Sequence, residues 1–115
     1  MKRIGMIAAV SILMLPLSGQ AGSLEENIAK GKKLAFDGSK GNCLACHLIP
    51  GGEMAGNLGP PLLQMKQRYP KRSVLDSQIW DSTAKNPQSM MPPFGKHGIM
   101  TKDEVGYVVD YMYSL

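Results

Sequence analysis

The chain has 115 residues, of which 43% are apolar, so it is long enough for one globular domain and too short for two. This length excludes a large multi-substrate enzyme. Thirteen Lys and Arg residues against nine Asp and Glu residues give a formal charge of +4. These charges are interspersed rather than clustered, so nucleic-acid binding has little support. Trp, Tyr and Phe together contribute few side chains, which leaves room in the core of a small domain for another apolar group.

The first 21 residues have the pattern of a cleaved secretory signal peptide. Two basic residues precede a mostly apolar run over residues 4–17, and small residues lead up to Ala21. A retained membrane anchor is the alternative, but the run contains a proline and is shorter than the ~20 residues that span a bilayer. We therefore expect removal of residues 1–21 on export, which leaves one unanchored periplasmic domain over residues 22–115. Its net charge is +2, because two of the basic residues leave with the signal.

Helix signals and long loops alternate along the rest of the chain. Ser23 and Glu26 form a capping-box pattern at the start of a helix that we expect over residues 24–36. Four glycines and three prolines within residues 50–61 exclude a regular element there. A second loop rich in Pro and Gly is expected over residues 86–98. Long loops in compact domains are usually functional, so both segments are candidates for a binding site.

Three further helices are expected. A short one covers residues 62–69, a second starts at Ser73 with Asp76, and the last starts with a second capping-box pair, Thr101 and Glu104. The residues expected on the buried faces of the last two helices are Leu75, Ile79, Trp80, Val105, Val108, Val109 and Met112. With no convincing strand, the pattern predicts an all-α fold.

The sequence Cys43-Leu-Ala-Cys46-His47 is a C-x-x-C-H motif, the attachment signature of c-type haem. Each thiol adds across one haem vinyl group to form a thioether, and the adjacent histidine is thereby placed under the iron. A disulfide would leave the histidine unexplained, and a thioredoxin-like pair would need a βαβ context. A zinc site would need two further ligands, for which His97 is the other soft candidate. The motif therefore predicts one covalently bound haem c, which also supplies the missing apolar group.

A sixth iron ligand is expected from the second loop. Met91 is the preferred candidate because it directly precedes Pro92, which holds the chain extended at that point. Met90 is the alternative methionine, and His97 would instead give bis-histidine ligation. Both methionines could also be flexible core residues. A His/Met pair raises the reduction potential relative to a bis-histidine pair.

Three other features bear on the site. A metal-bound histidine usually donates its second ring N–H to a carbonyl or carboxylate, and the Pro60 carbonyl is placed to accept it from His47, although a plain loop turn explains Pro60 equally well. Trp80 is expected in the core or at the edge of the cofactor. A local basic cluster is interpreted as a solvated face in preference to a docking patch; its members are Lys66, Arg68, Lys71 and Arg72.

The motifs together resemble those of a known family. The chain resembles small His/Met cytochromes c in its order of motifs and, more narrowly, the SoxX family of monohaem cytochromes. The similarity lies in GNCLACH (residues 41–47), AGNLGPPL (residues 55–62) and NPQSMMPPFGKHGIMT (residues 86–101), within a match over residues 24–115. SoxX proteins are subunits of the periplasmic SoxAX cytochromes of thiosulfate oxidation.

The resemblance implies a partner and a role. In that family the complex joins thiosulfate oxidatively to a cysteine of a carrier protein, an L-cysteine S-thiosulfotransferase activity whose site lies in the SoxA chain. This chain would form a heterodimer with a SoxA-like cytochrome, accept the electrons and pass them to a downstream cytochrome, with no catalytic residue of its own. The resemblance also implies a close crossing of the first and last helices at Gly31 and Tyr111. The competing functions are a free electron-shuttle cytochrome and an open-site haem peroxidase or gas binder.

Overall fold

The computed structural model describes residues 22–115, and the expected signal peptide lies outside the described residues. Within this range the chain forms helices joined by loops and has no strand, which confirms the all-α prediction. No helix among these residues is long and apolar enough to cross a membrane. The α-helices are α1 (Leu24–Phe36), α2 (Met65–Arg68), α3 (Arg72–Trp80) and α4 (Lys102–Met112), and single 3-10 turns form η1 (Cys43–Ala45) and η2 (Ser82–Ala84).

Helices α1 and α4 begin at the expected caps. The Ser23 hydroxyl accepts the backbone N–H of Glu26 at 3.2 Å. At the start of α4 the box is complete, because Glu104 donates its backbone N–H to Thr101 Oγ1 at 3.2 Å and accepts the Thr101 N–H at 2.8 Å. Each cap satisfies N–H groups that a helix start leaves unpaired.

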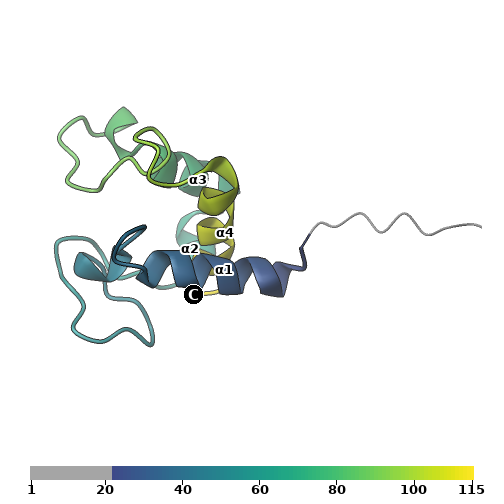
Figure 1. Cartoon of the computed structure of the whole chain (residues 1–115). Helices are drawn as coiled ribbons and strands as arrows, with labels where there is room; N and C mark the ends of the chain where they lie inside the picture. The colour runs from purple at the N-terminus through teal and green to yellow at the C-terminus, as the bar shows by residue number, and fades with distance from the viewer. Residues whose placement is uncertain (1–21) are drawn as a thin grey trace, which may run out of the picture.

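The two capped helices cross at a glycine. A Cβ atom added to Gly31 would lie 1.9 Å from the Tyr107 carbonyl oxygen and 2.9 Å from Tyr111 Cβ, so the two backbones touch here. This crossing confirms the expected pairing of Gly31 with Tyr111. Figure 1 shows α1 running across one end of α4 and α3 lying beside the other end. Helix α4 is therefore the element that joins the rest of the fold.

The core is built on the buried face of α4. Val105, Val108, Val109 and Met112 are at most 2% exposed, as their helical spacing predicts. They pack with apolar side chains of the other helices and loops; these include Ala35, Ile49, Leu62, Met65, Leu75, Ile79, Phe94 and Met100. Both long loops leave this core on the same side, as Figure 1 shows on the left.

Two helix boundaries differ from the prediction. The short helix covers Met65–Arg68 rather than residues 62–69, because the Leu62 N–H bonds to the Leu48 carbonyl at 2.9 Å and Gln64 adopts a left-handed φ of 51°. Helix α3 starts at Arg72, one residue before Ser73, because the Val74 N–H already bonds to the carbonyl of Lys71.

Trp80 is not a core residue. Its side chain is 37% exposed, and its ring packs on the backbone of Gly95, where an added Cβ would lie 1.9 Å from Trp80 Cε3. The Trp80 carbonyl also accepts the N–H groups of Gly95 and Lys96, each at 3.1 Å. The tryptophan therefore holds the end of the second loop against α3. Its position at the end of that helix, rather than in the middle, keeps it at the surface.

Candidate functional site

The C-x-x-C-H motif forms a single tight turn. Asn42 enters it with a left-handed φ of 45°, a conformation that asparagine tolerates better than most residues. The N–H groups of Cys46 and His47 then both bond to the Cys43 carbonyl, at 3.2 and 2.9 Å. Both thiols are free, and burial raises the pKa of the Cys43 thiol to about 11, which keeps it protonated at neutral pH. This turn brings all three motif side chains to the wall of one cavity.

The His47 ring is held by the Gly59-Pro60 backbone. His47 Nδ1 lies 2.7 Å from the Pro60 carbonyl oxygen, the contact that the sequence predicted. Because a carbonyl can only accept, Nδ1 is the donor, and in the neutral imidazole Nε2 then keeps its lone pair. An added Cβ on Gly59 would lie 2.3 Å from His47 Cε1, so this glycine allows the loop to lie against the imidazole. The ring is thus oriented with one nitrogen available as a metal ligand.

Met91 lines the same cavity from another loop and is held at several atoms. The buried Ser82 hydroxyl donates to its carbonyl oxygen, and its N–H donates to Ser89 Oγ at 3.2 Å. Gln78 Nε2 on α3 lies 3.8 Å from Met91 Sδ. The sequence analysis did not single out Ser82, Ser89 or Gln78. Gln78 could have been found from its position, because it lies three residues after buried Leu75 on a helix face that should be apolar.

The cavity between these two sides has a volume of about 420 Å³, within the range of small-molecule and cofactor sites. Two loop segments contribute most of its polar atoms: the first loop segment, residues 41–60, carries the C-x-x-C-H motif, and the second loop segment, residues 86–94, carries Met91. Its floor is apolar and comes from the helices and the core; the residues are Leu62, Met65, Leu75, Ile79, Phe94, Met100, Val108 and Met112.

The four residues of the basic cluster are exposed, as expected for a solvated face, and one of them reaches the cavity. Among the described residues that line the cavity, Arg68 alone carries a fixed charge. Its Nη1 donates to the Pro61 carbonyl at 2.7 Å, which holds the guanidinium at the cavity wall. Arg68 therefore belongs to that exposed face and also reaches the cavity wall, where it offers a cationic group to an anionic substituent of a bound molecule.

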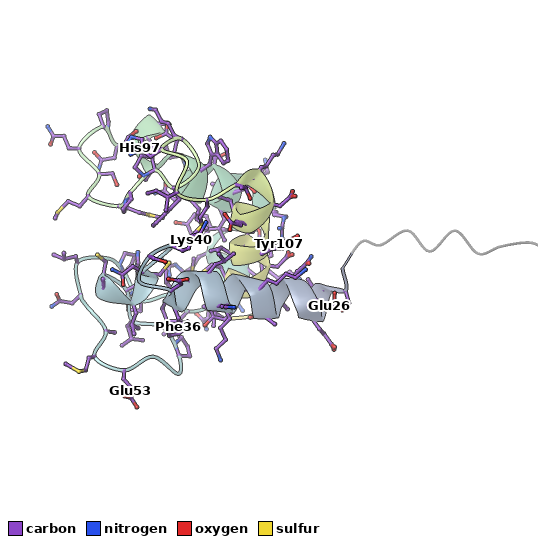
Figure 2. All side chains as sticks on the ribbon, viewed as in Figure 1. Glu26, Phe36, Lys40, Glu53, His97 and Tyr107 are labelled. Carbon is purple, nitrogen blue, oxygen red and sulfur yellow. The ribbon has the colours of Figure 1, made fainter. Side chains whose placement is uncertain are left out.

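The other candidate residues lie farther from the site. His97 is exposed and does not line the cavity, and neither does Trp80. His97 lies in the turn that follows the second loop segment, and Figure 2 labels it in the upper part of the structure. Met90 does line the cavity, but it is 79% exposed, whereas Met91 is half-buried and hydrogen-bonded. The geometry therefore favours Met91 over both alternatives as the partner of His47.

Lys40 connects the two sides of the structure behind the cavity. Its ammonium group lies 3.1 Å from Glu104 Oε1 and donates to the Ile99 carbonyl at 3.3 Å. Figure 2 places Lys40 between the two loop segments. The contact ties the turn after α1 to the start of α4, so it limits how far the two sides of the cavity can separate.

Comparison with known proteins identifies the family. The model of the cytochrome c family matches residues 28–115. The chain belongs to the cytochrome c family. This cytochrome is also similar to an uncharacterized lipoprotein of Aquifex aeolicus (strain VF5), with 33% identity over 76 residues. The match covers 65% of this chain and 37% of that protein, so the cytochrome spans little more than a third of its relative.

Family membership implies covalently bound haem c and a role in haem electron transfer, and the residues of the cavity fit that group. Cys43 and Cys46 present two free thiols on one turn, His47 offers Nε2, and Met91 offers a thioether from another loop. No cluster of three His, Cys, Asp or Glu side chains within residues 22–115 would hold a metal ion instead. These are the kinds of donor that a His/Met c-type cytochrome would use.

Proposed function

We propose that this cytochrome is the monohaem electron-transfer subunit of a SoxAX-like complex in the periplasm. The carrying observation is that His47 and Met91 line one cavity from opposite loop segments, because two such ligands leave no open iron position for a substrate. This arrangement favours electron transfer over peroxidase or gas-binding chemistry.

The assignment to thiosulfate oxidation is supported by the resemblance of the two cavity-lining loops to SoxX. In the proposed complex a carrier thiol and thiosulfate lose two electrons and one proton as a sulfur–sulfur bond forms between them. The whole chain has two cysteines, and both belong to the haem motif. No thiol is then left to act as a sulfur nucleophile. The bond-forming site is therefore proposed to lie in a SoxA-like partner, and this chain receives the electrons for a downstream cytochrome.

Exposed apolar side chains at the cavity mouth support an obligate partner. Leu58 on the first loop segment and Met90 on the second both line the cavity, and they are 70% and 79% exposed. Exposed apolar groups on both sides of a functional opening are typical of contact surfaces. Export to the periplasm is supported by the signal-like sequence of residues 1–21 and by the name of the lipoprotein relative.

The test is purification of the native protein followed by reduction assays. We expect a second haem-containing chain to co-purify, and thiosulfate with the carrier protein to reduce the haem of this chain only when that partner is present. A monomer that donates electrons to a terminal acceptor equally well alone would instead identify a free electron shuttle. Rapid CO binding to the ferrous protein at neutral pH would indicate an open-site haem protein and contradict the His/Met assignment.

A further inference from the structure

Gln78 is a polar side chain on the apolar wall of the cavity. It lies on α3 between the buried residues Leu75 and Ile79, which line the same cavity. Gln78 is half-buried, so its side-chain amide loses part of its contact with water and gains from a hydrogen-bond partner. The partner of Gln78 Nε2 is Met91 Sδ, at 3.8 Å. A thioether is a weak acceptor, so this contact alone does not explain an amide where a leucine would pack without cost.

The backbone of Met91 is fixed independently of Gln78. Ser82 and Ser89 hold its carbonyl and N–H groups, as described above. These two hydrogen bonds fix the backbone of Met91, but they leave the three rotatable bonds of its side chain free. Gln78 is the residue whose contact reaches the sulfur itself. Any preference among orientations of the sulfur must therefore come from Gln78 and from the packing around it.

We infer that Gln78 is a positioning residue for the axial methionine. This inference rests on the proposed role of Met91 as the iron ligand. A thioether sulfur has two lone pairs, and binding a metal through either one gives opposite configurations at sulfur. An N–H that is donated to one lone pair leaves the other for the metal, so Gln78 selects one configuration. The same contact favours Met91 over the adjacent Met90, whose side chain is largely in solvent.

The test compares two variants of the holoprotein with a matched control. Gln78→Leu removes the amide, and Gln78→Glu keeps the shape of the side chain but offers no N–H when ionised. Gln67→Leu makes the same chemical change on exposed residue 67 of α2, outside the cavity lining. The readout is the NMR spectrum of the ferric protein, in which the pattern of haem-methyl shifts reports the configuration at the bound sulfur.

We expect one configuration in the wild type and in Gln67→Leu. Both Gln78 variants should keep the absorption band of iron–thioether coordination but show a mixture or an averaged pattern of the two configurations. A wild-type pattern in both Gln78 variants would overturn the positioning role. Absence of the iron–thioether band in the wild type would instead contradict the proposed ligand, so the two failures are distinguishable.

A second measurement needs no variant. In the ferrous wild-type holoprotein we expect a nuclear Overhauser contact between the Gln78 side-chain amide and the Met91 methyl group, with slowed exchange of that amide with solvent. An amide that exchanges at the rate of an exposed glutamine and shows no such contact overturns the inference, even where the Gln78 variants fail to fold.

Discussion

At the scale of single residues, the site depends on how the side chains of its two candidate iron ligands, His47 and Met91, are held in place. The Pro60 carbonyl orients the His47 ring and leaves Nε2 available, and Ser82 and Ser89 hold the backbone of Met91. The Pro60 carbonyl fixes the tautomer of the imidazole, and Ser82 fixes the backbone beneath the thioether. Side chains held in this way need little rearrangement when the metal changes its charge, which suits a protein that carries electrons.

The first prediction concerns the choice between the adjacent methionines. Met91→Leu should abolish the charge-transfer absorption band of iron–thioether coordination and allow the ferrous protein to bind CO, because leucine keeps the volume but removes the ligand. Met90→Leu is the matched control and should leave the band unchanged, since Met90 is 79% exposed. Persistence of the band in Met91→Leu would show that another residue is the ligand.

A second prediction at this scale concerns Arg68. Its positive charge at the cavity wall opposes oxidation of the iron, so Arg68→Leu should lower the reduction potential. For a partly exposed charge worth about 0.5–1 kcal/mol, the shift is on the order of 20–40 mV, measured by redox titration. Lys71→Leu, at an exposed position outside the cavity, should shift the potential much less. Equal shifts in the two variants would assign the effect to net charge alone.

At the scale of elements, the crossing of α1 and α4 determines where the haem motif lies. The motif follows α1 after a short turn, and α4 carries the apolar floor of the cavity. Contact between the helix backbones at Gly31 brings the motif close to that floor. A single glycine in mid-helix, which costs about 1 kcal/mol relative to alanine in helix propensity, is therefore explained by tertiary packing.

The crossing yields a prediction for stability. Gly31→Ala should lower the free energy of unfolding by about 1–3 kcal/mol, because its Cβ would overlap the Tyr107 carbonyl. Gly106→Ala is the control on α4, since its Cβ would meet nothing nearer than Arg72 Nη2 at 4.0 Å. That variant should be neutral or stabilising by up to about 1 kcal/mol. Denaturant unfolding of both holoproteins measures the difference, and equal effects would rule out the close crossing.

The cap of α4 gives a prediction about pH. The Thr101 backbone N–H, with help from Lys40, lowers the pKa of Glu104 below its ordinary value of 4.5. The unfolded chain therefore takes up this proton at a higher pH than the folded chain. The resulting stabilisation is fully present above about pH 4.5 and is lost as the pH falls through the folded-state pKa.

The variant Glu104→Gln should accordingly be less stable than the wild type by about 1 kcal/mol at pH 7, with the difference shrinking toward pH 3. Denaturant unfolding at several pH values measures it. Glu53→Gln is the control, because Glu53 is an exposed residue on the first loop segment and points away from the fold in Figure 2. A constant difference across this pH range would contradict the role given to the Glu104 carboxylate.

At the scale of the whole molecule, the arrangement of the two loop segments depends on the group that fills the cavity between them. They leave the helical core on the same side, and the cavity occupies the space that they share with α3 and α4. The ion pair between Lys40 and Glu104 ties the turn just before the first loop segment to the start of α4. A surface ion pair contributes little, so the bound group itself must supply most of the cohesion between the loops.

The final prediction concerns removal of the haem. Without the haem, the apolar side chains that line a cavity of about 420 Å³ would be in contact with water, which is a large loss of apolar burial for a small domain. The Cys43→Ala/Cys46→Ala double variant, purified without haem, should therefore lose cooperative thermal unfolding and much of its helical circular dichroism. A sharp unfolding transition in that variant would show that the helices form a core without the cofactor.

The sequence alone determined the chemistry of one side of the site and most of the helices. The C-x-x-C-H spacing is local, since one turn of chain sets it, and the caps and apolar spacing of the first and last helices are also local patterns. The helix boundary near Gln64 was predicted less well, because hydrogen bonds such as the one from Leu62 to Leu48, which is distant in the sequence, decide it. Local signals cannot report such contacts.

The tertiary structure alone decided which residues surround the cofactor cavity. Met91 lines the same cavity as His47, Gln78 lies beside the sulfur and Arg68 lies at the wall, although these residues come from different elements. Trp80 and His97, which the sequence also offered, lie outside the cavity lining. The physical reason is that the type of a residue determines its chemistry, whereas the direction in which its side chain points depends on how α3 and the loops pack. The few aromatic residues suggested that another group fills the core, and the structure shows the space for it.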